Sequence, residues 1–392
     1  MTPAARVQAA IEILDLIIAA AQAGGAPADR IVSDWFRTRR FAGSGDRRAV
    51  RELVYAAIRV CGEVPSGGRA AMLVLASGDP TLTELFDGSN HAPAPIDPGE
   101  PLAQSGIAPA WLEHALAASG IDGDEAVALL ARAPLDLRVN ALKADRGTLE
   151  LPEPAKHTFA PNGLRLKHGT PVEQWDAFKD GAIEVQDTGS QLACLALRAQ
   201  PGETVIDLCA GAGGKTLALA ADMAGRGNLI ASDTDRPRLS KLAPRAVRAG
   251  ATNIETRLLD PNREREALGD LLGKADAVLI DAPCSGTGTL RRNPEARWRL
   301  TPAEVARYAA IQARLLDLAA GLLRSGGRLV YVTCSLLDAE GADQAAAFLE
   351  RNPGWHPEPA GLPAGRPRGP GTRLTPFHDG TDGFFIARFD SP

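Results

Sequence analysis

The chain has 392 residues, enough for two or three domains that each bury a sizeable core. It carries 43 basic and 48 acidic side chains, and this mild balance excludes both a polybasic tail and an acidic solvating tail. The longest apolar stretch, residues 9–21, is interrupted by Glu12 and Asp15, so we expect no membrane span. Residues near the N-terminus do not form a signal-peptide core followed by a cleavage site.

The cysteines bear on redox compartment and metal binding. Their number is five, they stand far apart, and no Cys-x-x-Cys pair occurs. This pattern argues against a disulfide framework and against a zinc ribbon. We therefore expect a cytoplasmic protein with reduced thiols and no metal site.

Residues 1–75 are predicted to be helical. Apolar residues recur at helical spacing over residues 7–18 and again from Asp46 to Val60. Between Arg30 and Arg69 stand nine Arg and four acidic residues, a local net charge of +5. This stretch is either a solvated helical surface or a face that contacts phosphates.

The next part of the chain is less regular. Residues 78–109 are rich in Pro, Gly and Asp, which indicates a linker or a long loop. A short helix is expected from Trp111 to Ala118. A strand is expected from Arg138 to Lys143, leading into a small mixed module.

From about residue 181, short apolar strands alternate with helices. The predicted strands are Thr204–Asp207, Leu229–Asp233, Ile254–Leu259, Ala277–Asp281, Arg328–Thr333 and Gly383–Phe389. The predicted helices are Leu217–Ala224, Arg236–Ala249, Pro302–Leu323 and Ala339–Glu350. This alternation predicts an α/β fold with a parallel sheet that helices cover on both faces.

A glycine-rich loop, Asp207-Leu-Cys-Ala-Gly-Ala-Gly-Gly-Lys215-Thr, follows the first of these strands and opens a helix. A phosphate-binding P-loop would need glycine at position 209, where this chain has Cys209. The loop instead suits a ligand that approaches the backbone at the carboxyl edge of the sheet. Asp233 ends the next strand, where a carboxylate can bind ribose hydroxyls. The pattern favours a nucleoside-bearing cofactor over a tight turn without a ligand.

Two cysteines follow strands of the predicted sheet. The fourth strand ends in Asp281-Ala-Pro-Cys284, and the fifth leads directly into Cys334. If these strands are neighbours, they lie about 4.8 Å apart, and both thiols reach the edge where open α/β folds bind ligands. We therefore expect this pair to be reactive. The other thiols are expected to pack as small apolar side chains: Cys61, Cys194 and Cys209.

Three segments carry a resemblance to a known family: Cys209–Thr216, Asp281–Gly288 and Tyr331–Ser335. They resemble the RNA cytosine-carbon-5 methyltransferases of the NOP/Sun type, in particular the bacterial ribosomal RNA enzymes of the RsmB or Fmu type. Further matches bring the resemblance to about residues 135–392: Val185–Gln191, Arg291–Trp298 and Asp382–Phe385.

The chain departs from the family pattern in two places. The loop reads Ala-Gly-Ala-Gly-Gly where the family usually has Ala-Ala-Pro-Gly-Gly. After Thr-Cys-Ser, the family's Glu-Asn-Glu is represented only by Glu340-Gly-Ala-Asp343.

The resemblance implies a fold and a domain plan. Residues 181–392 are expected to form a Rossmann-like domain of the class I S-adenosylmethionine-dependent methyltransferases. Residues 101–180 are expected to form a small α+β module that connects the domains and contacts RNA. Residues 1–95 resemble, through the segment Asp46–Tyr55, the all-α NusB-like RNA-binding domain of the same bacterial enzymes.

The resemblance also implies a reaction. Carbon 5 of cytosine is a poor nucleophile, but a thiolate that adds to carbon 6 activates it toward a methyl sulfonium. By resemblance, Cys334 is the nucleophile and Cys284 assists proton removal and product release; the reverse assignment is the alternative. Asp281 is expected to hydrogen-bond N3 and the amine of the flipped base. The implied substrate is 16S ribosomal RNA, unassembled or in a loop region, and the oligomeric state leaves no signature.

The implied cofactor is S-adenosylmethionine. Asp233 is expected to bind its ribose and Asp260 its adenine, with Asp281 also beside it. The methionine end is expected to lie against the glycine-rich loop: Cys209, Ala210, Gly211, Ala212, Gly213, Gly214 and Lys215.

A second basic stretch follows the Pro-Cys thiol. Between Gly286 and Arg314 stand six Arg and two Glu, which predicts a track for RNA phosphates. Trp298 within it is expected to be a core residue rather than a platform for a stacked base. Three other functions stay open: cytosine methylation of tRNA, methyl transfer to DNA or a small molecule, and a non-catalytic assembly factor that binds ribosomal RNA.

Overall fold

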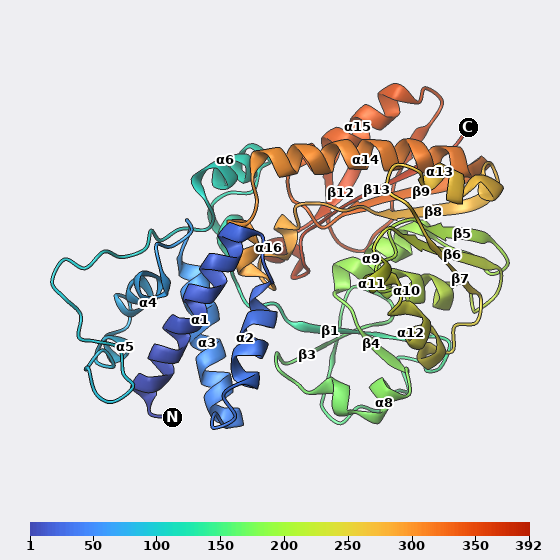
Figure 1. The fold of residues 1–392 in the computed structure, drawn as a ribbon. Helices are drawn as coiled ribbons and strands as arrows, with labels where there is room; N and C mark the ends of the chain where they lie inside the picture. The colour runs from blue at the N-terminus through green and yellow to red at the C-terminus, as the bar shows by residue number, and fades with distance from the viewer. The chain divides into compact units, whose positions relative to one another are not determined.

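The computed structural model describes residues 1–392, which divide into two compact units (Figure 1). The first comprises Met1–Ala131 with Thr289–Pro302, and the second comprises Arg132–Gly288 with Ala303–Pro392. This division differs from the three expected ranges: residues 101–131 group with the N-terminal helices, and residues 132–180 group with the large sheet. No helix has both the length and the apolar character needed to cross a membrane.

The first unit is all-helical, as the sequence predicts. Its core forms where the apolar side of the first helix, including Ile13, Leu14 and Ile17, packs against Val50 and Val54 of the third. The expected long loop at residues 78–109 contains one short helix. The helices are α1 (Pro3–Ala23), α2 (Ala28–Arg37), α3 (Ser44–Val60), α4 (Gly68–Ala76), α5 (Pro80–Thr83), α6 (Ala110–Ala118), α7 (Gly123–Ala128) and the 3-10 helix η4 (Pro294–Trp298).

The segment 289–302 is part of this helical core, although it follows the Pro-Cys loop in the chain. Arg297 is fully buried and donates hydrogen bonds to the backbone oxygens of Ile58 and Cys61, each at 2.7 Å. Glu295 accepts a bond from the backbone N–H of Ala28 at 3.0 Å. Trp298 packs in the core, as expected.

The phosphate track expected between Gly286 and Arg314 is therefore wrong for most of its arginines. Arg291 and Arg297 are buried. Arg299 donates to backbone oxygens at the end of α1, and Arg314 pairs with Glu264. Charge counted along a sequence does not show which guanidinium groups the chain itself will bind.

The second unit is built on a mixed sheet of nine strands, in the order β11-β12-β13-β9-β8-β5-β6-β7 with β10 beside β13. The strands β5 to β9 are parallel, as predicted. They are β5 (Thr204–Asp207), β6 (Asn228–Asp233), β7 (Ile254–Leu258), β8 (Ala275–Asp281), β9 (Leu323–Thr333), β10 (His356–Glu358), β11 (Arg366–Arg368), β12 (Gly371–Leu374) and β13 (Phe384–Asp390).

The last strand corrects the expectation of a purely parallel sheet. β13 runs antiparallel to β9, with Phe385 opposite Thr333. It also runs antiparallel to β12, from which only a short connection separates it. A connection that short cannot carry the crossover that a parallel neighbour needs, so the chain turns back along the sheet.

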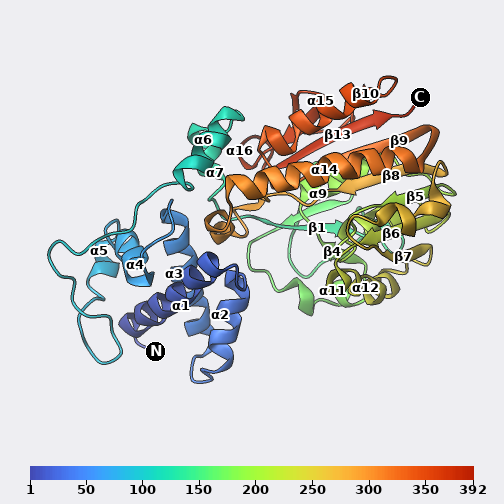
Figure 2. The same cartoon turned by 45° about the horizontal axis from the view of Figure 1, so that its top comes forward.

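Helices cover both faces of this sheet (Figure 2). Alternate strand residues face opposite sides: Val205 and Leu279 join one core, and Ile206 and Val278 join the other. The first core is closed by α9 (Thr188–Leu197), α10 (Gly214–Asp222), α11 (Arg236–Leu239) and α12 (Leu242–Ala249). The second is closed by α14 (Pro302–Leu322), α15 (Ala342–Arg351) and the segment after α13 (Glu264–Ala267), which contributes Leu268 and Leu271.

The expected helix Arg236–Ala249 is broken into α11 and α12. Pro244 lies in the first turn of α12, where it supplies no backbone N–H to continue the ladder from α11. The remaining short elements are α8 (Asp176–Lys179), α16 (Pro376–Asp379), η1 (Val172–Gln174), η2 (Gly269–Leu271), η3 (Thr287–Thr289) and η5 (Asp338–Glu340).

A separate four-stranded antiparallel sheet lies in the same unit, in the order β2-β3-β1-β4. The strand expected at Arg138–Lys143 begins earlier and ends at Val139, because the side chain of Asn140 accepts a hydrogen bond from the N–H of Leu142 and turns the chain. The strands are β1 (Leu135–Val139), β2 (Lys156–His157), β3 (Gly163–Leu166) and β4 (Ile183–Val185).

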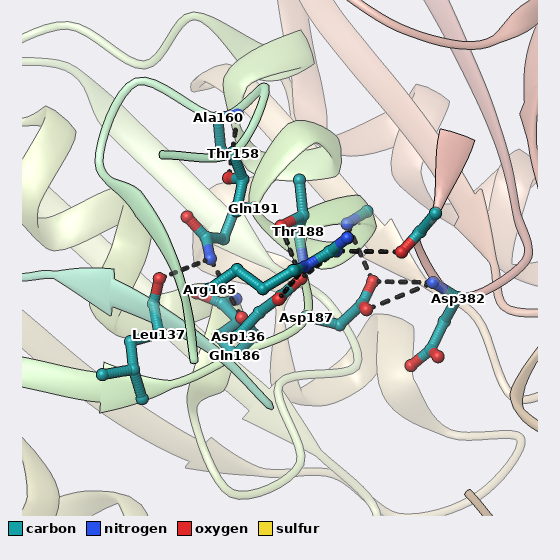
Figure 3. A network of polar contacts seen from close by, with 12 residues as sticks. Asp136, Leu137, Thr158, Ala160, Arg165, Gln186, Asp187, Thr188, Gln191 and Asp382 are labelled. Atoms are coloured by element: carbon teal, nitrogen blue, oxygen red, sulfur yellow. Dashed lines mark hydrogen bonds and ion pairs between the residues drawn. The ribbon is translucent and has the colours of Figure 1, made fainter. Parts of the chain in front are cut away.

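A polar network joins this small sheet to the start of α9 (Figure 3). The buried carboxylate of Asp136 accepts two bonds from Arg165, at 2.7 and 2.8 Å, and one from the hydroxyl of Thr188 at 2.6 Å. Both oxygens of Asp187 accept from the backbone N–H of Asp382, at 3.1 Å. These bonds fix the small sheet and the turn before β13 to one helix of the large domain.

Candidate active site

The loops that carry the predicted site residues lie at one edge of the large sheet. β8 pairs in parallel with β5 on one side and with β9 on the other. After β5 the chain first builds β6 and β7 on one side and then returns to β8 on the other, so β5 and β8 flank the point where the strand order reverses. Ligands of open α/β sheets bind at the carboxyl ends of strands at such a point.

The two thiols meet at this edge. The sulfur atoms of Cys284 and Cys334 lie 3.4 Å apart, and both side chains are partly exposed. The expected convergence of the two cysteines is therefore confirmed. The contact with Cys334, together with burial, holds the pKa of Cys284 well above that of an ordinary thiol. At neutral pH Cys284 is thus a protonated thiol.

Lys215 and Asp281 form an ion pair across the same point, with 2.7 Å between Nζ and Oδ2. Burial alone would lower the pKa of Lys215, but the charge and hydrogen bond of Asp281, together with the two nearby thiols Cys194 and Cys334, outweigh it and raise that pKa. The ammonium also interacts electrostatically with Cys334 and lies 5.5 Å from the ring centre of Phe384. The sequence predicts that both residues lie beside the cofactor but does not show that they pair with each other.

The glycine-rich loop has the backbone that the sequence predicts. Gly211 and Gly213 have φ angles of 55° and 85°, in the left-handed region that favours glycine. A Cβ atom at Gly213 would lie 2.2 Å from the side chain of Leu242, which would have to shift to admit a larger residue. Burial raises the pKa of Cys209 well above its usual range, which leaves this thiol unreactive at neutral pH.

Asp233 lies at the end of β6 beside this loop. Its two carboxylate oxygens accept bonds from the backbone N–H groups of Gly211 and Asp235, both at 2.7 Å. Asp260 follows β7 and is exposed. Both acids therefore lie on the carboxyl side of the sheet, and their expected ligands stay predictions.

Two of the remaining cysteines are core residues, as expected. Cys61 is fully buried in the helical unit, and burial raises its pKa to about 11. Cys194 is buried in α9 beneath the large sheet.

The sequence gives Glu340 no role beyond being what remains of the family's Glu-Asn-Glu segment, whereas the structure places it at the site. Its fully buried carboxylate contacts both Ser285 and Ser335, the residues that follow the two thiols. The available signal was the Cys-Ser sequence in both loops, which places two hydroxyls where a single acceptor could join them.

The helical unit carries a different kind of candidate site. A surface cavity of about 330 Å³ lies on α2 and α3 and is lined by Phe36, Ser33 and three arginines. Arg48 and Arg51 are exposed, and their side chains make no hydrogen bond or ion pair within the chain. Arg47 is also exposed and donates to the backbone oxygen of Ala42.

Fold and site together define a class: a Rossmann-like α/β domain of the S-adenosylmethionine-dependent methyltransferase type, as the sequence predicts. The family model for the 16S rRNA methyltransferases RsmB/F matches residues 194–390. The chain belongs to this family.

Individual proteins show the same likeness. The probable ribosomal RNA small subunit methyltransferase B of Synechocystis is 39% identical over 267 residues, which are 64% of this chain and 59% of that protein. The crystal structure of PH0851 has a TM-score of 0.78 and 25% identity, with 100% of this chain and 99% of that chain covered. A methyltransferase homolog protein from Pyrococcus horikoshii has a TM-score of 0.61 and 27% identity, covering 72% and 99%.

The match to the curated relatives is partial. The chain spans 59% of the length of the Synechocystis protein.

Proposed function

We propose that this protein methylates carbon 5 of a cytosine in 16S ribosomal RNA, with S-adenosylmethionine as methyl donor and two cysteines acting in turn. The observation that carries the proposal is the 3.4 Å contact between Cys284 and Cys334 beside the Lys215–Asp281 pair. A thiol is more often a small buried side chain than a reactive one. Two thiols that meet at a ligand-binding sheet edge, from loops 50 residues apart, are not explained by packing alone.

The residues at the sheet edge fit S-adenosylmethionine. Cys334, Asp281, the glycine-rich loop, Asp233 and Asp260 follow the neighbouring strands β9, β8, β5, β6 and β7 in that spatial order. Neighbouring strands are about 4.8 Å apart, so an extended molecule can reach all five ends. Adenine would lie by Asp260, ribose by Asp233 and the methionine end over the loop. The donor supplies a methyl group on a sulfonium, and this order brings that group toward the thiols.

The chain's own residues would divide the reaction as follows. The Cys334 sulfur bonds to carbon 6 of the flipped cytosine, and the electron pair of the ring's 5,6 double bond makes carbon 5 nucleophilic. As the sulfur bonds to carbon 6, the proton of the Cys334 thiol passes to N3 of the ring, and the carboxylate of Asp281, held by Lys215, accepts hydrogen bonds from this N3–H and from the amine. After methyl transfer, a base removes the proton from carbon 5, and the bond between carbon 6 and Cys334 breaks.

The geometry supports Cys284 as that base. Its raised pKa has the contact with Cys334 as its largest cause. Once Cys334 is bonded to carbon 6, it is a neutral thioether and this cause is gone. Cys284, which is partly exposed, can then release its proton to solvent water and accept the one on carbon 5.

The arginine-lined cavity on α2 and α3 supports RNA as the substrate. Arg48 and Arg51 have no acidic partner in the chain, and unpaired guanidinium groups bind phosphate oxygens. We therefore propose that the helical unit is the NusB-like RNA-binding domain. The target base must be unstacked, which favours unassembled RNA or a loop.

Trapping with RNA that contains 5-fluorocytidine tests the proposal. Fluorine at carbon 5 cannot leave as a proton, so the enzyme stays bonded to the RNA. We expect a covalent adduct with wild-type protein and with Cys284→Ser, and none with Cys334→Ser. The opposite pattern for the two variants would establish the reverse assignment.

Methyl transfer from S-adenosylmethionine to separated 16S ribosomal RNA, tRNA and DNA tests the substrate. Methylation of tRNA alone would favour that alternative. Binding of ribosomal RNA without transfer to any substrate would favour a non-catalytic assembly factor.

A further inference from the structure

A buried polar cluster lies directly beneath the two thiols. Each reactive cysteine is followed by a serine, Ser285 or Ser335, and both serines are buried. Between them lies Glu340, whose side chain is fully buried. The reaction proposed above uses none of these three residues.

The carboxylate of Glu340 is fully engaged by hydrogen-bond donors. Its Oε1 atom accepts from the backbone N–H of Ser285 at 2.8 Å and from the side chain of Gln312 at 3.2 Å. Its Oε2 atom accepts from the hydroxyls of Ser285 and of Ser335, the latter at 2.6 Å. A carboxylate offers about four lone-pair sites, so all of them are used.

These bonds join three parts of the domain. Ser285 belongs to the loop after β8, Ser335 to the loop after β9, and Gln312 to α14. Gln312 also donates to the backbone oxygen of Pro283 at 2.9 Å. The hydroxyl of Tyr331 donates to the backbone oxygen of Glu340 at 2.7 Å, which fixes the backbone that carries this acid.

We propose that Glu340 is the positioning residue that holds the loops of Cys284 and Cys334 together, so that both sulfurs address one base. The proposal rests on the proposed function. Without Glu340, the N–H of Ser285 loses its acceptor in a buried place, and the hydroxyls of Ser285 and Ser335 are left only with each other, at 3.1 Å, and with the hydroxyl of Thr287. Unpaired buried donors cost about 1–3 kcal/mol each, so the loops would separate to reach water or other partners.

The distance between the two thiols can be measured without any RNA. Phenylarsine oxide condenses with two thiols on its single arsenic atom, forming two As–S bonds and releasing one water. We expect wild-type protein to be bridged by one equivalent, with the bridge assigned to Cys284 and Cys334 by peptide mass spectrometry. Glu340→Ala should slow the bridging at least about tenfold, because a small displacement of paired reacting groups has large rate effects.

Two variants separate positioning from a general loss of structure. Glu340→Gln keeps an oxygen for the N–H of Ser285 and an amide that the two hydroxyls can accept from, so it should restore most of the bridging rate. Glu264→Ala removes another buried carboxylate, which pairs with Arg314 and contacts neither thiol loop. Bridging at the wild-type rate in folded Glu340→Ala would overturn the proposal, as would equal slowing in Glu264→Ala.

The kinetic readout uses methyl transfer to RNA. Glu340→Ala should lower kcat about 100-fold, with KM for RNA and the affinity for S-adenosylmethionine unchanged. An equal rise in KM would contradict a positioning role. If wild-type protein methylates no RNA, the proposed function fails, while the arsenical measurement still decides whether Glu340 holds the thiols together.

Discussion

The sheet edge of the second unit and the outer surface of α2 and α3 in the first use charged side chains in opposite ways. At the edge, Lys215 is paired with Asp281, and Glu340 has a donor on every lone pair. On α3, Arg48 and Arg51 are exposed and have no partner in the chain. A charged group that is paired within the protein holds its partners in place, whereas an unpaired charged group at the surface can bind an ion from solution. The edge is therefore suited to chemistry and the helical surface to binding.

The largest effect is expected at the edge. Asp281→Asn removes the negative charge that holds Lys215 and that favours the N3-protonated form of the activated base, and methyl transfer should fall about 10³-fold. Asp276→Asn is the matched control, since Asp276 lies on the same strand and pairs with Arg324. Single-turnover methyl transfer to RNA measures both variants. Equal loss of rate in the two would show that the ion pair at the edge only supports the strand.

A second test concerns Arg297, whose guanidinium group is hydrogen-bonded to the backbone inside the helical unit. Arg297→Leu removes the side-chain donor to the buried oxygens of Ile58 and Cys61, so the free energy of unfolding of the helical unit should fall by about 3 kcal/mol. Arg48→Leu, at an exposed position, should change it by no more than about 0.5 kcal/mol. Denaturant unfolding, monitored by hydrogen exchange of the backbone amides in α3, measures the stability of both variants. Comparable losses of unfolding free energy in the two variants would contradict the distinction between arginines that are hydrogen-bonded within the fold and arginines that are exposed without a partner.

Much of the sheet edge was predictable because it depends on local signals. Strand ends, glycines and the position of Cys284 and Cys334 can be read from short segments, and parallel strands bring their carboxyl ends together. The partners of Lys215 and Glu340 were not predictable in this way. Lys215 meets Asp281 across 66 residues of chain, and Glu340 meets Ser285 across 55.

The arginines show again that contacts between distant parts of the chain cannot be predicted from short segments. The stretches around Arg48 and Arg297 are both rich in Arg; the sequence predicts phosphate contacts for the second and leaves the first open between a solvated surface and a phosphate-contacting face. The fold buries Arg297 and leaves Arg48 exposed, because residues 289–302 pack into the helical core. Only the three-dimensional contacts separate the two roles.

Unlike the other charged groups at the sheet edge, Asp207 has a carboxylate oxygen without a hydrogen-bond partner. The effect of replacing it on stability should lie between those of the other variants. Its Oδ1 atom is buried without a partner, and burial raises its pKa to about 7, while its other oxygen accepts from Thr216. The unfolded value is about 4, so the stability that Asp207 contributes is greatest below pH 4 and declines until about pH 7. Relative to Asp207→Asn, wild-type protein should lose about 2 kcal/mol between about pH 5 and pH 7. Parallel pH profiles of the two proteins would contradict a raised pKa.

The smallest effect is expected on the open arginines, where each contact adds affinity independently. Removing two charges in Arg48→Gln/Arg51→Gln should weaken RNA binding about tenfold at physiological salt. The slope of log affinity against log salt should fall by about 0.7 for each lost phosphate contact on single-stranded RNA. Arg37→Gln is the matched control, because Arg37 is exposed but paired with Asp34 at 3.2 Å. Affinity measured at several salt concentrations separates the cases: an unchanged slope in the double variant, or an equal change in Arg37→Gln, would mean that unpaired arginines on α3 are not where the RNA backbone binds.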